Sequence, residues 1–125
     1  MKDFAIELTD RPGELGRVAT ALSRYGVNIK AVTGLALEKH VLVRIIADDP
    51  DAARSALEHA GIRFTEGEIV QVLLENRAGE LAAVTAKLSE AKLNLRAIYL
   101  TGIVDNLVEL AIVTDDPKRT KRMLD

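Results

Sequence analysis

The chain carries one unit of sequence twice. When Phe4–Val32 is aligned with Val70–Ile98 at a constant offset of 66 residues, ten of the 29 aligned positions are identical and no gap is needed. A repeat of this length is domain-sized, because solenoid repeats run from roughly 20 to 50 residues. We therefore predict two tandem domains, residues 1–66 and 67–125 of the 125-residue chain.

Both copies predict the same order of elements. "FAIEL" and "IVQVLLE" are rich in β-branched and apolar residues and are predicted to be strands. A break follows each strand, and apolar residues then recur at helical spacing, as in Leu15, Val18 and Leu22. Two further strands follow in each copy, with a tight turn at Asp105–Asn106 in the second. A repeated "DDP" then predicts an aspartate N-cap with proline at the first helical position.

In the first copy the helix after "DDP" leads into a short fourth strand, "GIRFT". The order is β-α-β-β-α-β, which is the ferredoxin-like arrangement of the α+β class. It places two helices on one face of a four-stranded antiparallel sheet. We expect two tandem copies of this fold, each with its helices on one sheet face.

The sequence ends at Asp125, in or just after the second helix of copy two, and the last strand of that copy is missing from it. The segment "EIVQVLLE" (Glu68–Glu75) is therefore expected to lie at an open sheet edge. Such an edge is a template for pairing with another chain. Three alternatives remain: the chain continues beyond these residues, "GIRFT" crosses over to fill the gap, or a second molecule covers the edge. We expect a homodimer.

Composition and charge argue against several classes of protein. The net charge is −2 and the pI is about 5.7, whereas nucleic-acid-binding domains usually show a basic face. The absence of cysteine excludes disulfides, zinc fingers and thiol catalysis. The first residues carry acids too early for a signal peptide, and no apolar run approaches the roughly 18 residues of a membrane span. We expect a cytoplasmic protein that binds neither nucleic acid nor membrane.

No constellation of catalytic residues is visible. The serines have no GxSxG-type turn around them, and neither GxGxxG nor a P-loop occurs. His40 and His59 have no counterparts in copy two and form no helical metal-binding pair. We therefore expect no enzymatic activity, no metal and no cofactor.

The stretch "DRPGELGRVATALSRYGVNI" (Asp10–Ile29) resembles the signature of the ACT domain, a small-molecule sensor attached to many enzymes of amino-acid metabolism. The shared features are a polar-x-x-Gly-x-Leu turn after the first strand and Asn-Ile after the first helix. "NRAGELAAVTAKLSEAKLNL" (Asn76–Leu95) resembles it too, with Ala78 in place of proline. The resemblance implies that the domains pair side by side into an eight-stranded sheet and bind amino acids at the pair interface.

The resemblance implies ligand-binding residues in both copies. In the first they are Asp10, Arg11, Pro12, Gly13, Glu14, Leu15, Asn28 and Ile29, and in the second Asn76, Ala78, Gly79, Glu80, Leu81, Asn94 and Leu95. The start of a helix supports this independently, because its first N–H groups have no intrahelical partner and favour a carboxylate.

Other roles are open for several of these residues. Asp10 and Asn76 also suit helix N-caps, and asparagines such as Asn28 and Asn94 are common turn residues. Leu15 and Leu81 also suit the hydrophobic core, and the flanking arginines and glutamates suit a solvated surface.

The leading functional hypothesis is a regulatory sensor of a free amino acid. One alternative is a regulatory subunit that acts on an unlinked amino-acid biosynthetic enzyme. A stand-alone enzyme is the weakest hypothesis, because no acid–base pair or nucleophile repeats or clusters.

Overall fold

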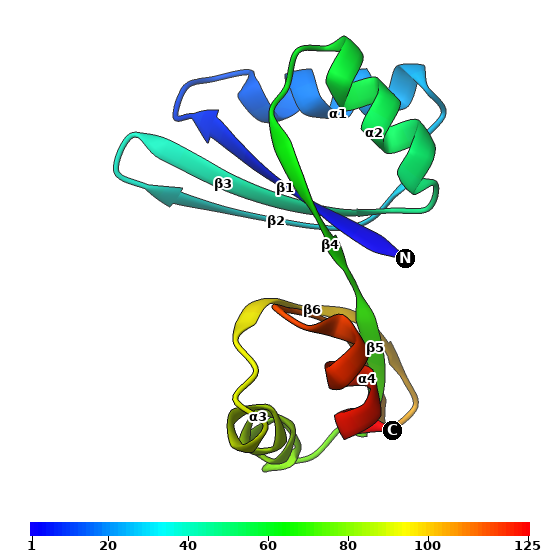
Figure 1. Ribbon diagram of the computed structural model, residues 1–125. Helices are drawn as coiled ribbons and strands as arrows, with labels where there is room; N and C mark the ends of the chain where they lie inside the picture. The colour runs from blue at the N-terminus through cyan, green and yellow to red at the C-terminus, as the bar shows by residue number, and fades with distance from the viewer. The chain divides into compact units, whose positions relative to one another are not determined.

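The computed structural model describes residues 1–125 and separates into two compact units, Met1–Gly67 and Glu68–Asp125. Figure 1 shows both units, which are described separately below. The elements of the first unit are β1 (Lys2–Thr9), α1 (Glu14–Arg24), β2 (Ile29–Leu37), β3 (His40–Ala47), α2 (Pro50–His59) and β4 (Phe64–Glu68). Those of the second are β5 (Val70–Glu75), α3 (Glu80–Glu90), β6 (Leu95–Val104), β7 (Leu107–Thr114) and α4 (Pro117–Leu124).

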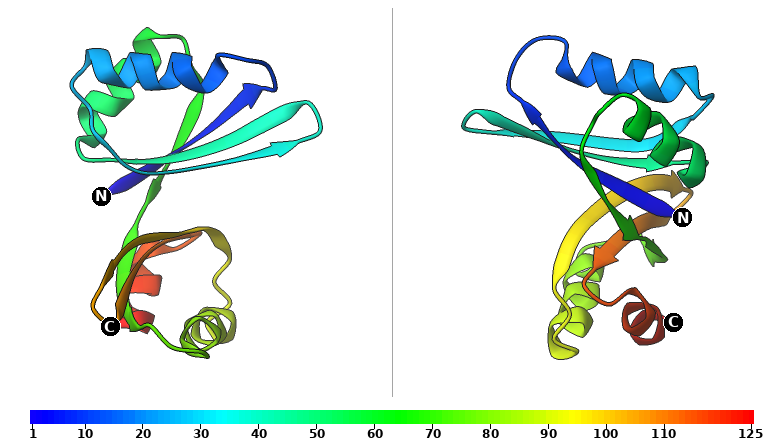
Figure 2. Two further views of the ribbon diagram at one scale, coloured as in Figure 1. Left: turned by 180° about the vertical axis from the view of Figure 1, so that it is seen from behind. Right: turned by 45° about the horizontal axis from the view of Figure 1, so that its top comes forward.

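The first unit is a four-stranded sheet in the order β2-β3-β1-β4, with α1 and α2 together on one face (Figures 1 and 2). β3 pairs antiparallel with both β1 and β2. Because side chains alternate along a strand, Phe4 and Ile6 of β1 share the helix-facing side with their partners Ile45 and Val43 of β3. The predicted βαββαβ order and the antiparallel pairing are confirmed in this unit.

The core of the first unit lies between the sheet and its two helices. The buried side chains of α1 recur at helical spacing, through Val18 and Leu22, and meet the helix-facing side of the sheet. Leu57 of α2 joins the same cluster, in which the rings of Phe4 and Phe64 pack edge to face with centroids 5.6 Å apart. This cluster holds α1, and therefore the turn that precedes it, in a fixed position on the sheet.

The second unit is a three-stranded sheet in the order β5-β7-β6, covered by α3 and α4. Its core is smaller and is built around Val84, Leu88, Leu110 and Ile112. The hairpin predicted at Asp105–Asn106 is confirmed, since Val104 and Leu107 face each other across the turn.

β5 lies at one edge of the second sheet and pairs with β7 on its other side. "GIRFT" does not cross over to fill that edge, because β4 is a strand of the first sheet. This alternative was wrong for a geometrical reason: only one residue separates β4 from β5, which is too short a connection for β4 to turn back and pair with β5.

α1 ends as predicted, with Gly26 in the left-handed region at φ 69° just after the last turn. In the second unit Lys92 takes this position at φ 58°. A side chain in this conformation is strained, by roughly 1 kcal/mol, where glycine is not. The second copy therefore keeps the geometry of the helix end without the residue that best suits it.

Candidate functional site

Two of the four helices begin with a side-chain cap, and two do not. Asp49 and Asp116 cap α2 and α4, each through a carboxylate oxygen 3.1 Å from a backbone nitrogen in the first turn. α1 and α3 begin at Gly13 and Gly79, which lie in the left-handed region at φ 88° and 92° and provide no side-chain cap. The repeated "DDP" is thus confirmed as a capping motif, whereas the repeated glycine turn leaves its helix start open.

The open helix starts have the properties of an anion site. The first backbone N–H groups of a helix have no partner in the helix, and the helix dipole adds partial positive charge there. Gly13 and Gly79 are both exposed, as are Leu15 and Gly16 in the first turn of α1, whereas the backbone N–H of Glu80 already donates to the carbonyl of Arg77 over 3.5 Å. A carboxylate is the kind of anion that such a helix start binds.

Asp10 and Asn76 are not the helix N-caps that the sequence suggested, because Gly13 and Gly79 hold that position. Instead, the backbone N–H of Asp10 donates to the carbonyl of Lys39 over 2.9 Å, and that of Asn76 to the carbonyl of Asn106. Each backbone bond ties the end of a first strand to a hairpin turn. Both side chains are exposed beside the helix start.

Glu14 was expected to be solvated and is instead buried, with 9% of its surface exposed. Its Oε2 lies 3.4 Å from Nε of Arg11 and 3.5 Å from Nε of Arg17. The two guanidinium groups compensate the buried charge, and the helix dipole also favours an acid in this turn.

The corresponding turn of the second unit carries a different charge arrangement. NH1 of Arg77 lies 2.8 Å from Oε2 of Glu75, and Nε of Arg77 lies at the longer distance of 3.9 Å from Oε1 of Glu80. Arg17 has no counterpart, because Ala83 occupies that position. The first turn therefore has two cations around one acid and the second has one cation between two acids, so the two turns are not electrostatically equivalent.

Leu15 and Leu81 do not belong to the core, since 50% and 53% of their surfaces are exposed. The buried stripe of α1 runs through Glu14, Val18 and Leu22, and Leu15 falls to one side of it. Helical spacing alone did not show which side of α1 faces the sheet and which faces solvent. Arg11, Pro12, Ala78 and Arg77 are exposed as well.

The asparagine after each first helix is tied to the aspartate that precedes each cap. The backbone N–H of Asn28 donates to Oδ1 of Asp48 over 3.0 Å, and Asn94 repeats this bond to Asp115 over 3.1 Å. The Asn94 amide also donates from Nδ2 to Oδ2 of Asp115 over 2.9 Å. These hydrogen bonds lower the pKa of the Asp115 carboxyl below its usual value. Sequence reasoning missed both aspartates, although the second copy of "DDP" contained the signal.

A pocket of about 370 Å³ lies beside the second asparagine. Asn94 and Leu95 line it together with Lys92 and the end of α3. Of the corresponding pair in the first unit, Asn28 is exposed and Ile29 half-buried.

The structure does not bring the two halves of each predicted site together. Gly13 and Asn28 lie at opposite ends of α1, whose 11 residues span about 16 Å. Gly79 and Asn94 are separated in the same way by α3. A single small ligand therefore does not contact both loops of one domain.

No three histidine, cysteine or acidic residues are grouped so that they would hold a metal ion. None of the helices is both long and apolar enough to span a membrane.

The family model described as "ACT domain pair" matches residues 1–124. Among solved structures, a protein from Bacteroides thetaiotaomicron is similar over 98% of this chain and 85% of its own, with 24% identity and a TM-score of 0.84. The regulatory subunit of aspartate kinase from Thermus thermophilus is similar over 98% of this chain and 88% of its own, with 16% identity and a TM-score of 0.65. No curated protein matched the chain. The structural neighbours share the fold.

Proposed function

The chain belongs to the ACT domain pair family, and from this premise we propose that it is a regulatory, non-catalytic protein that binds a free amino acid between paired domains. The observation that carries the proposal is the contrast between its helices. α1 and α3, which follow the repeated glycine turn, begin without a side-chain cap, whereas α2 and α4 are capped by aspartate. An α-carboxylate supplies the acceptor that these helix starts lack.

The separation of the two loops supports a site that two domains share. The helix start of one domain binds the carboxylate, and the asparagine loop of a paired domain completes the site. Asparagine both donates and accepts hydrogen bonds, as a zwitterionic amino acid requires. In the first unit the Asn28 side chain is exposed, whereas Asn94 already donates to Asp115. The sites are therefore expected to differ in affinity.

A thermal-shift screen of the twenty amino acids tests this proposal. At least one is expected to raise the melting temperature, because a ligand at a hundredfold excess over its Kd stabilises the folded state by about 2.7 kcal/mol. The amide form of the same amino acid, which lacks the carboxylate charge, is the matched control and is expected to give no shift. Equal shifts from both compounds would contradict a carboxylate site at the helix start.

We propose further that the chain forms a homodimer through the edge of β5. β5 is an edge strand with alternating half-buried and exposed residues, and Leu73 is 63% exposed. Proteins usually cover such an edge.

Light scattering at micromolar concentration is expected to give twice the 13.6 kDa mass of one chain. Leu73→Lys is expected to weaken the dimer, because charge on an edge strand opposes pairing. Leu37→Lys, which adds the same charge to β2 at an edge of the first sheet, is the matched control. A monomer mass for the parent chain, or dissociation by the control substitution alone, would contradict pairing through β5.

A second candidate function is a regulatory subunit of an unlinked amino-acid biosynthetic enzyme. It is favoured by apolar side chains on the first sheet, where Leu35 of β2 and Leu42 of β3 are paired and both exposed. Exposed apolar residues grouped in this way suit a protein partner. A partner enzyme that co-purifies with the chain and covers these leucines would favour this function over a free sensor.

A further inference from the structure

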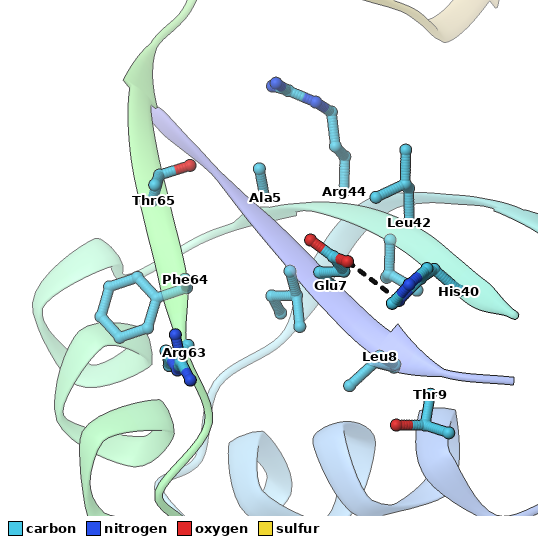
Figure 3. A pocket seen from close by; sticks show the side chains of 12 residues that line it. Ala5, Glu7, Leu8, Thr9, His40, Leu42, Arg44, Arg63, Phe64 and Thr65 are labelled. Carbon is cyan, nitrogen blue, oxygen red and sulfur yellow. Dashed lines mark ion pairs between the residues drawn. The ribbon is translucent and has the colours of Figure 1, made fainter. Parts of the chain in front are cut away.

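A pocket of about 620 Å³ in the first unit contains none of the residues predicted to bind a ligand. Figure 3 shows it between β1 and the start of β4. Its wall on β1 is the second half of the strand, Ala5–Thr9. This volume lies in the range of small-molecule sites, about 300 to 1,000 Å³.

The pocket exists because β4 is shorter than the strand beside it. β1 has eight residues and β4 has five. The end of β1 therefore lines an open space together with Arg63, Phe64 and Thr65, where a longer fourth strand would lie. An edge of this kind presents backbone N–H and C=O groups to whatever occupies the space.

One wall of the pocket is apolar. Ile6, Leu8 and Val43 are at most 4% exposed and belong to the buried core. The apolar surface open to the pocket therefore comes from exposed Leu42 and from half-buried Phe64, which is held in place by its edge-to-face contact with Phe4. A ligand with an apolar body is therefore favoured, because burying it against these side chains removes apolar surface from water.

The charged groups of the pocket leave one cation unpaired. Nδ1 of His40 lies 2.9 Å from Oε1 of Glu7, and the two side chains point toward each other in Figure 3. NH1 of Arg44 lies 2.6 Å from Oδ2 of Asp3. Arg63 is exposed and takes part in no hydrogen bond or ion pair. A planar guanidinium binds a carboxylate through two parallel hydrogen bonds.

We propose that this pocket is a second ligand site, which binds a small carboxylate with an apolar body. Arg63 binds the carboxylate, and Phe64, the neighbouring residue, contacts the apolar body. The site is separate from the helix starts, because the pocket includes neither the Gly13 turn nor Asn28. Two sources share this chemistry: a simple apolar carboxylic acid and an apolar amino acid.

The test is a titration of the full chain followed by backbone amide NMR. The probes are 4-methylpentanoate, its neutral isostere 4-methylpentanamide, and leucine. The carboxylate is expected to shift the amides of Ile6–Thr9 and Arg63–Thr65, and the neutral amide to bind at least about tenfold more weakly, because charge-assisted hydrogen bonds are lost. Tighter binding of 4-methylpentanoate would identify the ligand class as a simple carboxylic acid, and tighter binding of leucine would identify it as an amino acid.

Arg63→Gln is expected to weaken binding of the carboxylate at least about tenfold. The substitution keeps the fold, because Arg63 is exposed and makes no interaction that the fold needs. Arg24→Gln, an exposed arginine on α1 outside the pocket, is the matched control and is expected to leave the affinity unchanged. Unchanged affinity in R63Q, or no movement of these amides with either carboxylate probe, would overturn the proposal whether or not amino acids bind at the helix starts.

Discussion

Replacing Gly16 with aspartate is expected to weaken amino-acid binding at the first helix start while the fold stays intact. Gly16 is the third residue of α1, is exposed, and has nothing within 4 Å of the position a Cβ would take. An aspartate there interacts favourably with the helix dipole and has a slightly better helix propensity than glycine, so no loss of stability is expected. The same carboxylate repels that of the ligand, so affinity is expected to fall at least about tenfold.

The matched control is Gly16→Asn, which has nearly the same shape and no charge. It is expected to lose much less affinity. Ala82→Asp introduces the same negative charge at the equivalent position of α3 and tests the second site separately. Gly13 is a poor choice, because its φ of 88° strains any other residue and confuses folding with binding. Calorimetry that finds equal affinity in the aspartate and asparagine variants would contradict carboxylate binding at this helix start.

Leu22→Ala is expected to destabilise the first unit by about 2 to 5 kcal/mol, because it leaves a cavity in the core. Leu22 is 1% exposed and lies within the cluster between α1 and the sheet. Chemical denaturation followed by circular dichroism measures the loss as a lower transition midpoint.

Leu15→Ala makes the identical change seven residues earlier on the same helix and provides the control. Leu15 is half exposed, so the expected loss is within about 0.5 kcal/mol. Equal losses for the two leucines would show that Leu15 is part of the core after all. If Leu15 lines the ligand site, its substitution lowers amino-acid affinity without lowering stability.

The fold was predictable from the sequence because its signals repeat. Two copies of one pattern gave the element order twice, and the strand, helix and capping signals agreed at the level of single residues such as Asp49 and Asp116. Gly26 marked the end of α1 correctly, because the turn there needs the left-handed conformation that glycine adopts without strain.

The site was less predictable, because it depends on which side of a helix faces the sheet. Leu15 and Glu14 are neighbours in the sequence, yet the acid is buried between two arginines and the leucine is exposed. Polarity alone predicts the reverse. The ion pairs to Arg11 and Arg17 explain the difference, and their geometry is set by the turn at Gly13 rather than by composition.

The separation of the two half-sites was not visible in the motif. In the sequence, Gly13 and Asn28 belong to one 20-residue signature. In the structure, the helix between them holds them at opposite ends. Likewise, the pocket beside Arg63 depends on the difference in length between β1 and β4, which no motif records.

The most direct test of the central claim is a titration of the ¹⁵N-labelled chain with the amino acid that the thermal-shift screen selects. The amides of Glu14–Gly16 or Glu80–Ala82, at the uncapped helix starts, are expected to shift together with those of Asn28 or Asn94 and to saturate at one ligand concentration. Both sets of amides would saturate at the same ligand concentration because one ligand, held between two domains, contacts both. Shifts confined to other parts of the chain, or no binding of any amino acid at millimolar concentration, would contradict it.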